Sequence, residues 1–235
     1  MKWLLTIIVV LQTYGALGQG SFQNLDFESA NLTPIASGQP GVEVPITLAL
    51  PGWSAELGNS PVTQVWQNDF SLGAPSIDIL GPNWNSPPQI IDGYYSVVLQ
   101  AGLAGGVTPE TASLWQNGTI PAGTESLEFK AWDSGGITPP LVSFAGDNLS
   151  LFVLSSGVSP SGQTYNVYGA NIAPYADQTG QLEFTAAVGN VAGVGGIEMD
   201  DISFSTTAVP EPNSILLTGI GGLIFAWYRL RLRCR

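Results

Sequence analysis

Hydrophobic and polar residues alternate along several short segments in the middle of the chain. In 127–132, Leu127, Phe129 and Ala131 fall on one side of an extended backbone, and mostly polar residues fall on the other. An alternation with a period of two predicts β-strands that bury one face. The same period recurs in the segments 149–153, 165–168, 181–186 and 202–204.

Turn-forming residues separate these segments, and no stretch between residues 19 and 208 keeps a helical period. Glycine (29) and proline (17) are frequent among the 235 residues, and both disfavour helix interiors. Short strands between turns predict an all-β fold, an antiparallel β-sandwich of the jelly-roll type. Because the span 19–208 has the size of a single domain, we assign it to one β-sandwich domain.

The N-terminus has the layout of a secretory signal peptide. A basic residue, Lys2, precedes the apolar run 3–11, and the small residues Ala16 and Gly18 follow. Small side chains at this spacing mark a cleavage site. We predict that residues 1–18 are a signal peptide and that the protein is exported.

The C-terminus carries an uncharged apolar segment, Ile215 to Tyr228, followed by arginines. This segment is shorter than the roughly 17–25 residues of a spanning helix, which by itself favours a core or interfacial helix. Arginines on the cytoplasmic side obey the positive-inside rule, and their long side chains extend the effective span. We therefore predict a transmembrane helix ahead of a basic tail. The tail charges are Arg229, Arg231, Arg233 and Arg235.

The tripeptide Pro210, Glu211 and Pro212, the apolar segment and the arginine tail together resemble a PEP-CTERM sorting signal, which would cover residues 209–235. In that family a membrane enzyme, an exosortase, recognises the Pro-Glu-Pro tripeptide. The resemblance implies a Gram-negative bacterium that makes exopolysaccharide. It also implies an inner-membrane-anchored precursor whose body then reaches the cell surface or the extracellular matrix.

Charge divides the chain in the same way. The formal net charge is −12, yet every acidic residue except Glu211 lies between residues 19 and 208, where Lys130 is the only base and the net charge is about −16. Such a domain repels polyanions, which argues against nucleic acid as a partner. With no histidine and with Cys234 as the single cysteine, Ser-His-Asp catalysis, Cys-His catalysis and an intrachain disulfide are excluded.

Two edges of the domain resemble galactose-binding-like jelly rolls, a superfamily that includes many carbohydrate-binding modules. The opening residues 24–28, followed by Pro51-Gly52-Trp53, are similar to the first strands of that superfamily, and residues 197–204 are similar to its last strand. The resemblance implies that the opening and closing strands lie close together.

The same resemblance implies a structural calcium ion held by carboxylates from these two strands. Carried over to this sequence, the ligands are Glu28 and Asp200, with Asp201 and Asp26 as alternates. Calcium favours hard oxygen ligands of this kind. The alternative is that Asp200 and Asp201 are solvated acids at the start of a strand.

A long central loop gathers side chains of the types that bind sugars. Trp84, Tyr94 and Tyr95 lie there among asparagines, prolines and an aspartate. Aromatic faces stack on sugar rings, and amides and carboxylates bond the hydroxyl groups. We predict a sugar platform on these three residues, against the alternative that they pack into the fold. Trp53 and Trp115 are assigned to the core.

These patterns predict an exported, non-catalytic structural protein of an exopolysaccharide matrix, with an exosortase and the membrane as partners. The alternative is a carbohydrate-binding module that holds the protein to the polysaccharide. A glycosidase needs only two suitably spaced carboxylates. No motif among the many acidic residues singles out such a pair, so enzyme activity is the least favoured interpretation.

Overall fold

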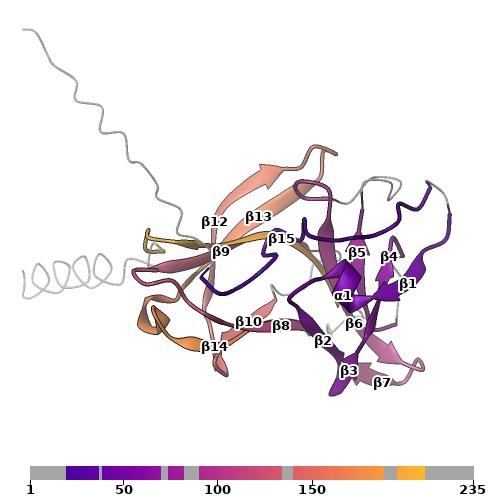
Figure 1. Cartoon of the computed structure of the whole chain (residues 1–235), viewed down its shortest axis with the longest axis horizontal. Coiled ribbons are helices and arrows are strands. Elements are labelled where there is room, and N and C mark those ends of the chain that lie inside the picture. The colour runs from indigo at the N-terminus through magenta and orange to yellow at the C-terminus, as the bar shows by residue number, and fades with distance from the viewer. Residues whose placement is uncertain are drawn as a thin grey trace, which may run out of the picture.

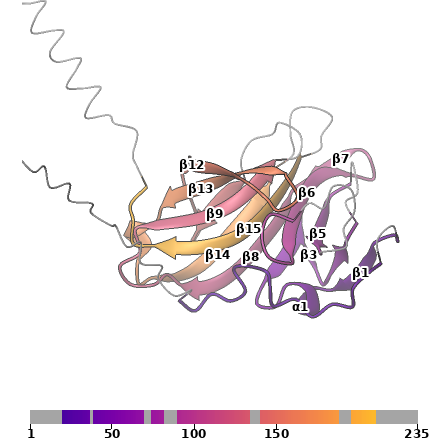
Figure 2. The same ribbon diagram turned by 90° about the horizontal axis from the view of Figure 1, so that it is seen from above.

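The computed structural model describes residues 20–36, 39–69, 74–81, 90–133, 140–187 and 195–209. Within these ranges the chain forms two β-sheets packed face to face, with one short helix, α1 (Ile46–Ala49), and one 3₁₀ turn, η1 (Ala173–Tyr175). Figures 1 and 2 show the two layers from perpendicular directions. The prediction of an all-β sandwich is confirmed.

The larger sheet has nine strands. They are β1 (Val42–Pro45), β4 (Gln64–Gln67), β5 (Ser76–Leu80), β6 (Ser96–Ala104), β7 (Thr108–Glu110), β9 (Ser126–Asp133), β12 (Leu151–Val158), β13 (Thr164–Asn171) and β15 (Gly195–Ser205). Their order is β1-β4-β5-β6-β15-β9-β13-β12, and β7 pairs with β6. All pairs in this sheet are antiparallel except β4 with β5.

The smaller sheet has six strands. They are β2 (Ser54–Leu57), β3 (Ser60–Val62), β8 (Ala112–Thr119), β10 (Leu141–Phe144), β11 (Asp147–Asn148) and β14 (Thr179–Ala186). Their order is β11-β10-β14-β8-β2-β3, and every pair is antiparallel.

The core lies between the two sheets and is rich in aromatic side chains. Phe129 from the larger sheet meets Phe184 from the smaller sheet edge to face, with 5.3 Å between ring centroids. Trp53 also packs against Phe184, and its indole Nε1 donates to the Asn24 carbonyl at 2.9 Å. This hydrogen bond satisfies the indole N–H, so Trp53 is buried without leaving an unpaired donor in the core.

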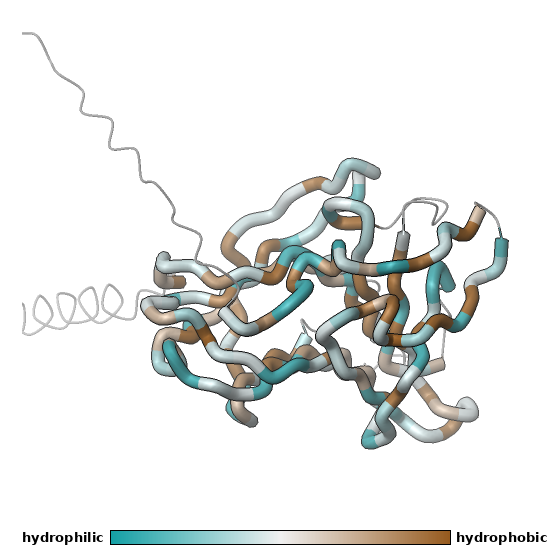
Figure 3. Tube along the Cα trace, viewed as in Figure 1, coloured by the Kyte–Doolittle hydropathy of each residue, from teal (hydrophilic) through white to brown (hydrophobic). Residues whose placement is uncertain are grey.

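The predicted buried face of residues 127–132 is confirmed, since Leu127, Phe129 and Ala131 are all at most 1 % exposed. Figure 3 shows hydrophobic (brown) and hydrophilic (teal) residues interspersed along the whole described chain. The pattern at 149–153 has a different outcome. The strand there, β12, is an edge strand: Leu149 and Leu151 are half-buried and pack against the core, as the alternation predicts, whereas Val153 is exposed.

The opening segment is a series of turns and not a strand, which corrects the expectation for residues 24–28. Asn24 and Phe27 have positive φ values of 51° and 57°. The Asn24 side chain accepts a hydrogen bond from the Ser29 N–H at 2.9 Å, a local bond that competes with strand pairing. The turns nevertheless bury Phe27 completely.

A β-bulge in β15 receives this opening segment. Asp200 pairs with Lys130, but the next pair across the same two strands is Ser203 with Glu128, so the register shifts in between. Asp201 has a φ of 52° within the bulge. The displaced Ile202 N–H donates to the Leu25 carbonyl at 2.9 Å. The bulge therefore links the opening and closing segments of the domain.

The predicted signal peptide, the sorting tripeptide at 210–212, the helix at 215–228 and the arginine tail all lie outside the described residues. Within the described ranges, no helix has the length and apolar character needed to cross a membrane.

Candidate functional site

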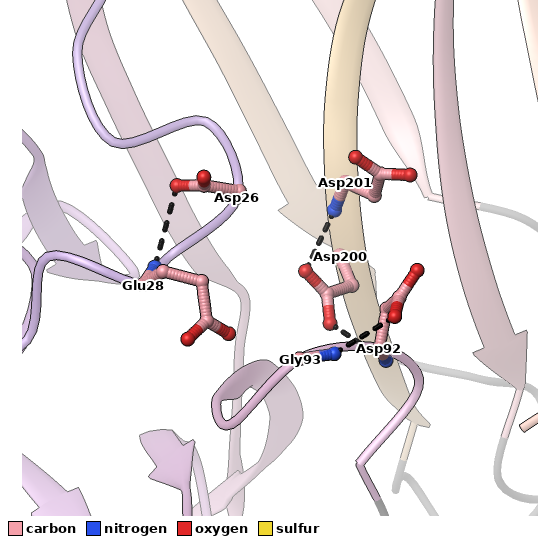
Figure 4. A pocket seen from close by; sticks show the side chains of 6 residues that line it. All are labelled: Asp26, Glu28, Asp92, Gly93, Asp200 and Asp201. Carbon is pink, nitrogen blue, oxygen red and sulfur yellow. Dashed lines mark hydrogen bonds between the residues drawn. The ribbon is translucent and has the colours of Figure 1, made fainter. Parts of the chain in front are cut away.

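An acidic pocket of about 210 Å³ lies where the opening turns, the loop before β6 and the β15 bulge meet. Figure 4 shows the acidic side chains that all three segments contribute to its lining, with the Asp201 carboxylate directed away from Glu28. Its lining residues are Asp26, Glu28, Asp92, Gly93, Asp200 and Asp201. The structure thus gathers all of the residues that the sequence suggested as metal ligands, and it adds Asp92, which the sequence analysis did not single out.

Glu28 is fixed by the loop before β6. Its Oε1 accepts the backbone N–H groups of Tyr94 at 2.7 Å and of Tyr95 at 3.0 Å. Gly93 has a φ of 57°, and a Cβ atom at this position would collide with the Glu28 carboxylate. Glycine is therefore required here both for its backbone conformation and for the close approach of the carboxylate.

Asp200 is buried and fully engaged by protein donors. It is 2 % exposed. Its Oδ2 accepts the Ser96 hydroxyl at 2.8 Å and the Asp92 N–H at 3.1 Å, and its Oδ1 accepts the Asp201 N–H at 2.7 Å. Burial raises the pKa of Asp200 to about 8, although these hydrogen bonds act in the opposite direction.

Lys130 supplies positive charge beside the pocket. Its Nζ forms ion pairs with Asp92 and, at 2.9 Å, with Asp201. Partial burial acts to lower the pKa of Lys130, but the two ion pairs outweigh it and raise the pKa above its usual value. The hydrogen bond from Lys130 lowers the pKa of Asp92. Lys130 is the one base of the domain, so an ion pair with an acidic residue could be predicted from the sequence. Its sequence position does not indicate which acidic residues are the partners.

The pocket offers the type of ligand that calcium prefers, but its carboxylates are not close enough together to form a metal site. Carboxylates are the ligands that calcium prefers, and Glu28, Asp200 and Asp201 provide them. However, the described residues contain no group of three or more acidic side chains that could hold a metal ion. Glu28 and Asp200 instead accept protein hydrogen bonds, and Asp201 accepts Lys130. Calcium stays a prediction.

Two further buried acids lie in neighbouring strands, and the sequence analysis did not identify them. Asp78 and Glu198 both pair with Val98, one from each side of β6. Glu198 is 1 % exposed, and burial raises its pKa to about 9. Burial also raises the pKa of Asp78 well above its usual range, although the Ser76 hydroxyl donates to it at 2.7 Å. Alternation alone cannot reveal such acids, because it does not show what covers the outer face of the sheet.

The predicted sugar platform is only partly within the described residues. Tyr94 is 66 % exposed, whereas Tyr95 is half-buried and packs against the core. Trp84 lies outside the described residues. The two tyrosines follow one another beside the acidic pocket, where their backbone N–H groups hold Glu28.

A second depression, of about 320 Å³, lies at the smaller sheet. Trp53 is 5 % exposed and belongs to the core, as predicted, and it also lines this depression. Trp115 corrects the prediction: it is half-buried and lines the depression, because its neighbour Leu114 takes the core-facing position on β8. Apolar and polar residues line the depression together, and four of them have hydroxyl or carboxylate side chains. They are Thr47, Ser54, Glu56 and Thr63.

No family model and no curated protein matches this chain. Among solved structures, TmCBM61 in complex with β-1,4-galactotriose is similar with a TM-score of 0.37 and 15 % identity, over 80 % of this chain and 98 % of that one. The enzymatically active domain of tailspike protein 4 from bacteriophage CBA120 has a TM-score of 0.34 and 12 % identity, over 80 % and 21 %.

A third similar structure comes from a study of promiscuous specificity in carbohydrate-binding modules of the β-sandwich superfamily. It has a TM-score of 0.33 and 13 % identity, over 66 % of this chain and 57 % of that one. The class that the fold itself defines is a two-sheet β-sandwich domain.

The buried acids predict that stability falls as the pH rises. Glu198 and Asp200 have pKa values of about 9 and about 8 in the folded state, so the folded protein keeps protons that the unfolded chain releases. The stability present at about pH 4 is therefore lost progressively as the pH rises to about 8–9. We expect urea unfolding in EDTA to show this loss of stability.

In the same experiment Glu198→Gln should reduce the slope of the free energy of unfolding against pH, because the glutamine amide is neutral at every pH of the series. The control Glu43→Gln removes an exposed carboxylate and should leave the slope unchanged. A free energy of unfolding that is flat between pH 5 and 8 in the unsubstituted protein would contradict the burial argument.

The calcium prediction is tested by thermal unfolding. If calcium binds the folded state alone, a hundredfold excess over Kd adds about 2.7 kcal/mol of stability and raises the Tm. Glu28→Gln should weaken this shift, and the exposed Glu43→Gln should not. The absence of any shift across millimolar calcium, compared with EDTA, would rule the ion out.

Proposed function

We propose that this protein is a non-catalytic, carbohydrate-binding β-sandwich that acts outside the cell. The observation that carries the proposal is the depression at the smaller sheet, where a half-buried indole, Trp115, lies beside hydroxyl and carboxylate side chains. Sugar rings stack on indole faces through their C–H groups, and their hydroxyls bond polar neighbours. A depression with both kinds of group suits a saccharide better than a purely apolar ligand.

The structure of β8 supports this use of Trp115. Ser54 pairs with Trp115 across β2 and β8, and Glu183 pairs with it on the other side. Next along the same face of β8, the Ser113 hydroxyl lies 2.8 Å from that of Thr185. The indole is therefore held on a regular sheet among neutral and acidic hydrogen-bonding groups, and a rigid sheet positions a binding site well.

The negative charge of the domain favours a neutral glycan as the ligand over an anionic one. With a net charge of about −16 between residues 19 and 208, the domain repels uronate-rich or sulfated polymers. Glu56 in the depression adds a local negative charge. Neutral hexose polymers are not repelled, and their hydroxyl groups donate to carboxylates.

A glycosidase is the rival interpretation, and the acidic pocket is where it would act. Such an enzyme needs two carboxyl groups that reach the substrate from opposite sides. Asp200 is 2 % exposed and both of its oxygens accept protein hydrogen bonds. An acidic side chain that is buried and hydrogen-bonded in this way has a structural role, so the proposal is non-catalytic.

Export and sorting complete the proposal. The signal-peptide pattern at 1–18 would direct secretion, and the PEP-CTERM resemblance at 209–235 would make the chain an exosortase substrate with a membrane-anchored precursor. A sugar-binding body released at the cell surface of a Gram-negative bacterium would then bind exopolysaccharide in the matrix. A purely structural matrix role is the alternative, and it needs no glycan contact at Trp115.

The sugar proposal is tested by titrating the protein with neutral oligosaccharides, β-1,4-galactan and β-glucan among them, and with an anionic polymer as a contrast. Trp115→Ala should weaken binding by about thirtyfold, which corresponds to about 2 kcal/mol for an aromatic anchor. Trp66→Ala, on β4 of the larger sheet, is the matched control and should retain binding. If a folded Trp115→Ala variant binds the oligosaccharide as tightly as the unsubstituted protein, the depression is not the binding site.

The sorting proposal is tested in the native host by the intact mass of the protein in each cell fraction. Replacing Pro210 and Pro212 by Ala should leave an uncleaved form in the membrane, because the recognised tripeptide is lost. The exposed body proline Pro160, replaced by Ala, should leave processing as it was. Normal processing of the double variant would contradict exosortase recognition.

A further inference from the structure

The strands at the sheet edges differ in how well they are protected against pairing with other chains. An open edge offers unpaired N–H and C=O groups, and charged residues, prolines and short length are the usual protections. Among the described strands, β1, β3, β7 and β11 are at most four residues long. Their protecting residues are Glu43 and Pro45 on β1, Pro61 on β3, Pro109 and Glu110 on β7, and Asp147 on β11.

Strand β12 lacks the protection of charge, proline and short length, and its one protecting feature is a β-bulge near its start. It has eight residues, Leu151–Val158, with no proline and no charge. It is the last strand of the larger sheet and pairs only with β13 among the described strands. Val153 and Val158 are 56 % and 64 % exposed. In Figure 1 the hairpin of β12 and β13 forms the upper rim of the molecule.

The strand is well formed despite its exposure. The Tyr165 ring lies over Gly157, where a Cβ atom would come within 2.5 Å of it, and the Leu154 side chain lies over Gly169 in the same manner. In these contacts a side chain of each strand packs over a glycine of the other. A bulge interrupts the register between Val153 and Ser155, and from Ser155 to Val158 the pairing is regular. The open edge is therefore an ordered strand and a ready template for another.

The charge pattern indicates what this edge accepts. Between Asp147 and Asp177 the sequence contains no charged residue, although the domain as a whole is strongly acidic. Two copies of so acidic a domain repel each other over most of their surface. At this neutral hairpin they can approach without placing like charges opposite each other. A basic partner would find no acidic groups to attract it on the hairpin.

We propose that β12 pairs with the β12 strand of a second copy of this chain, antiparallel and across a two-fold axis. The larger sheet would then continue through both copies. Such an interface is isologous, because each strand offers the same backbone groups and the same valines to the other. The pairing uses an edge separate from both depressions, so it does not depend on the sugar proposal.

The test measures the mass of the full chain in detergent by light scattering over a dilution series, together with hydrogen exchange of the β12 amides. We expect a dimer whose β12 amides are protected at high concentration and exposed on dilution. Combining Val153→Glu with Val158→Glu places like charges across the seam and should raise the dimer Kd at least about tenfold. Both side chains are exposed, so the monomer should keep its fold and Tm.

Val107→Glu is the matched control. It makes the same change at a residue that is 80 % exposed in the turn between β6 and β7, and it should leave the dimer intact. A monomer at every concentration would overturn the proposal. So would a dimer that resists the double substitution or leaves the β12 amides unprotected, because pairing would then occur elsewhere, for example through the C-terminal segment.

Discussion

The bulge in β15 is the local constraint on which the rest of the domain depends. β15 lies in the middle of the larger sheet, between β6 and β9, so an irregularity there affects both sides. The shift between Asp200 and Ser203 sends Ile202 into the core and turns its N–H toward Leu25. Through this bond the turns at the start of the domain dock onto its last strand, and the carboxylates of the acidic pocket come together as a consequence.

The acidic side chains in and near that pocket are neutralised in two different ways. Asp200 and Glu198 lie in a part of the sheet where water is excluded, which favours their protonated forms, while Asp92 and Asp201 share the ammonium group of Lys130. The raised pKa of Asp200 and the ammonium group of Lys130 thus reduce the negative charge of the pocket without an added ion. A divalent cation would have to displace these partners, and the energetic cost of that displacement sets the affinity that the calcium titration measures.

The two depressions and the open edge occupy different parts of the sandwich. The acidic pocket joins the ends of the domain, the depression beside Trp115 lies at the smaller sheet, and β12 lies at one rim of the larger sheet. Separation of this kind would let a glycan and a second copy of the chain bind at the same time. A paired protein would then present two glycan sites, and avidity would strengthen attachment to a repeating polymer.

The sequence by itself determined the features that depend on local pattern. Alternation placed Leu127, Phe129 and Ala131 on a buried face, and turn-rich composition specified a β-sandwich, because a period of two and frequent chain reversal are local properties. Tertiary structure alone decided which face Trp115 occupies, which strand is left at the edge, and that Glu198 is buried. Each of these depends on strand order and on what covers a sheet, and contacts between residues far apart in the chain fix both.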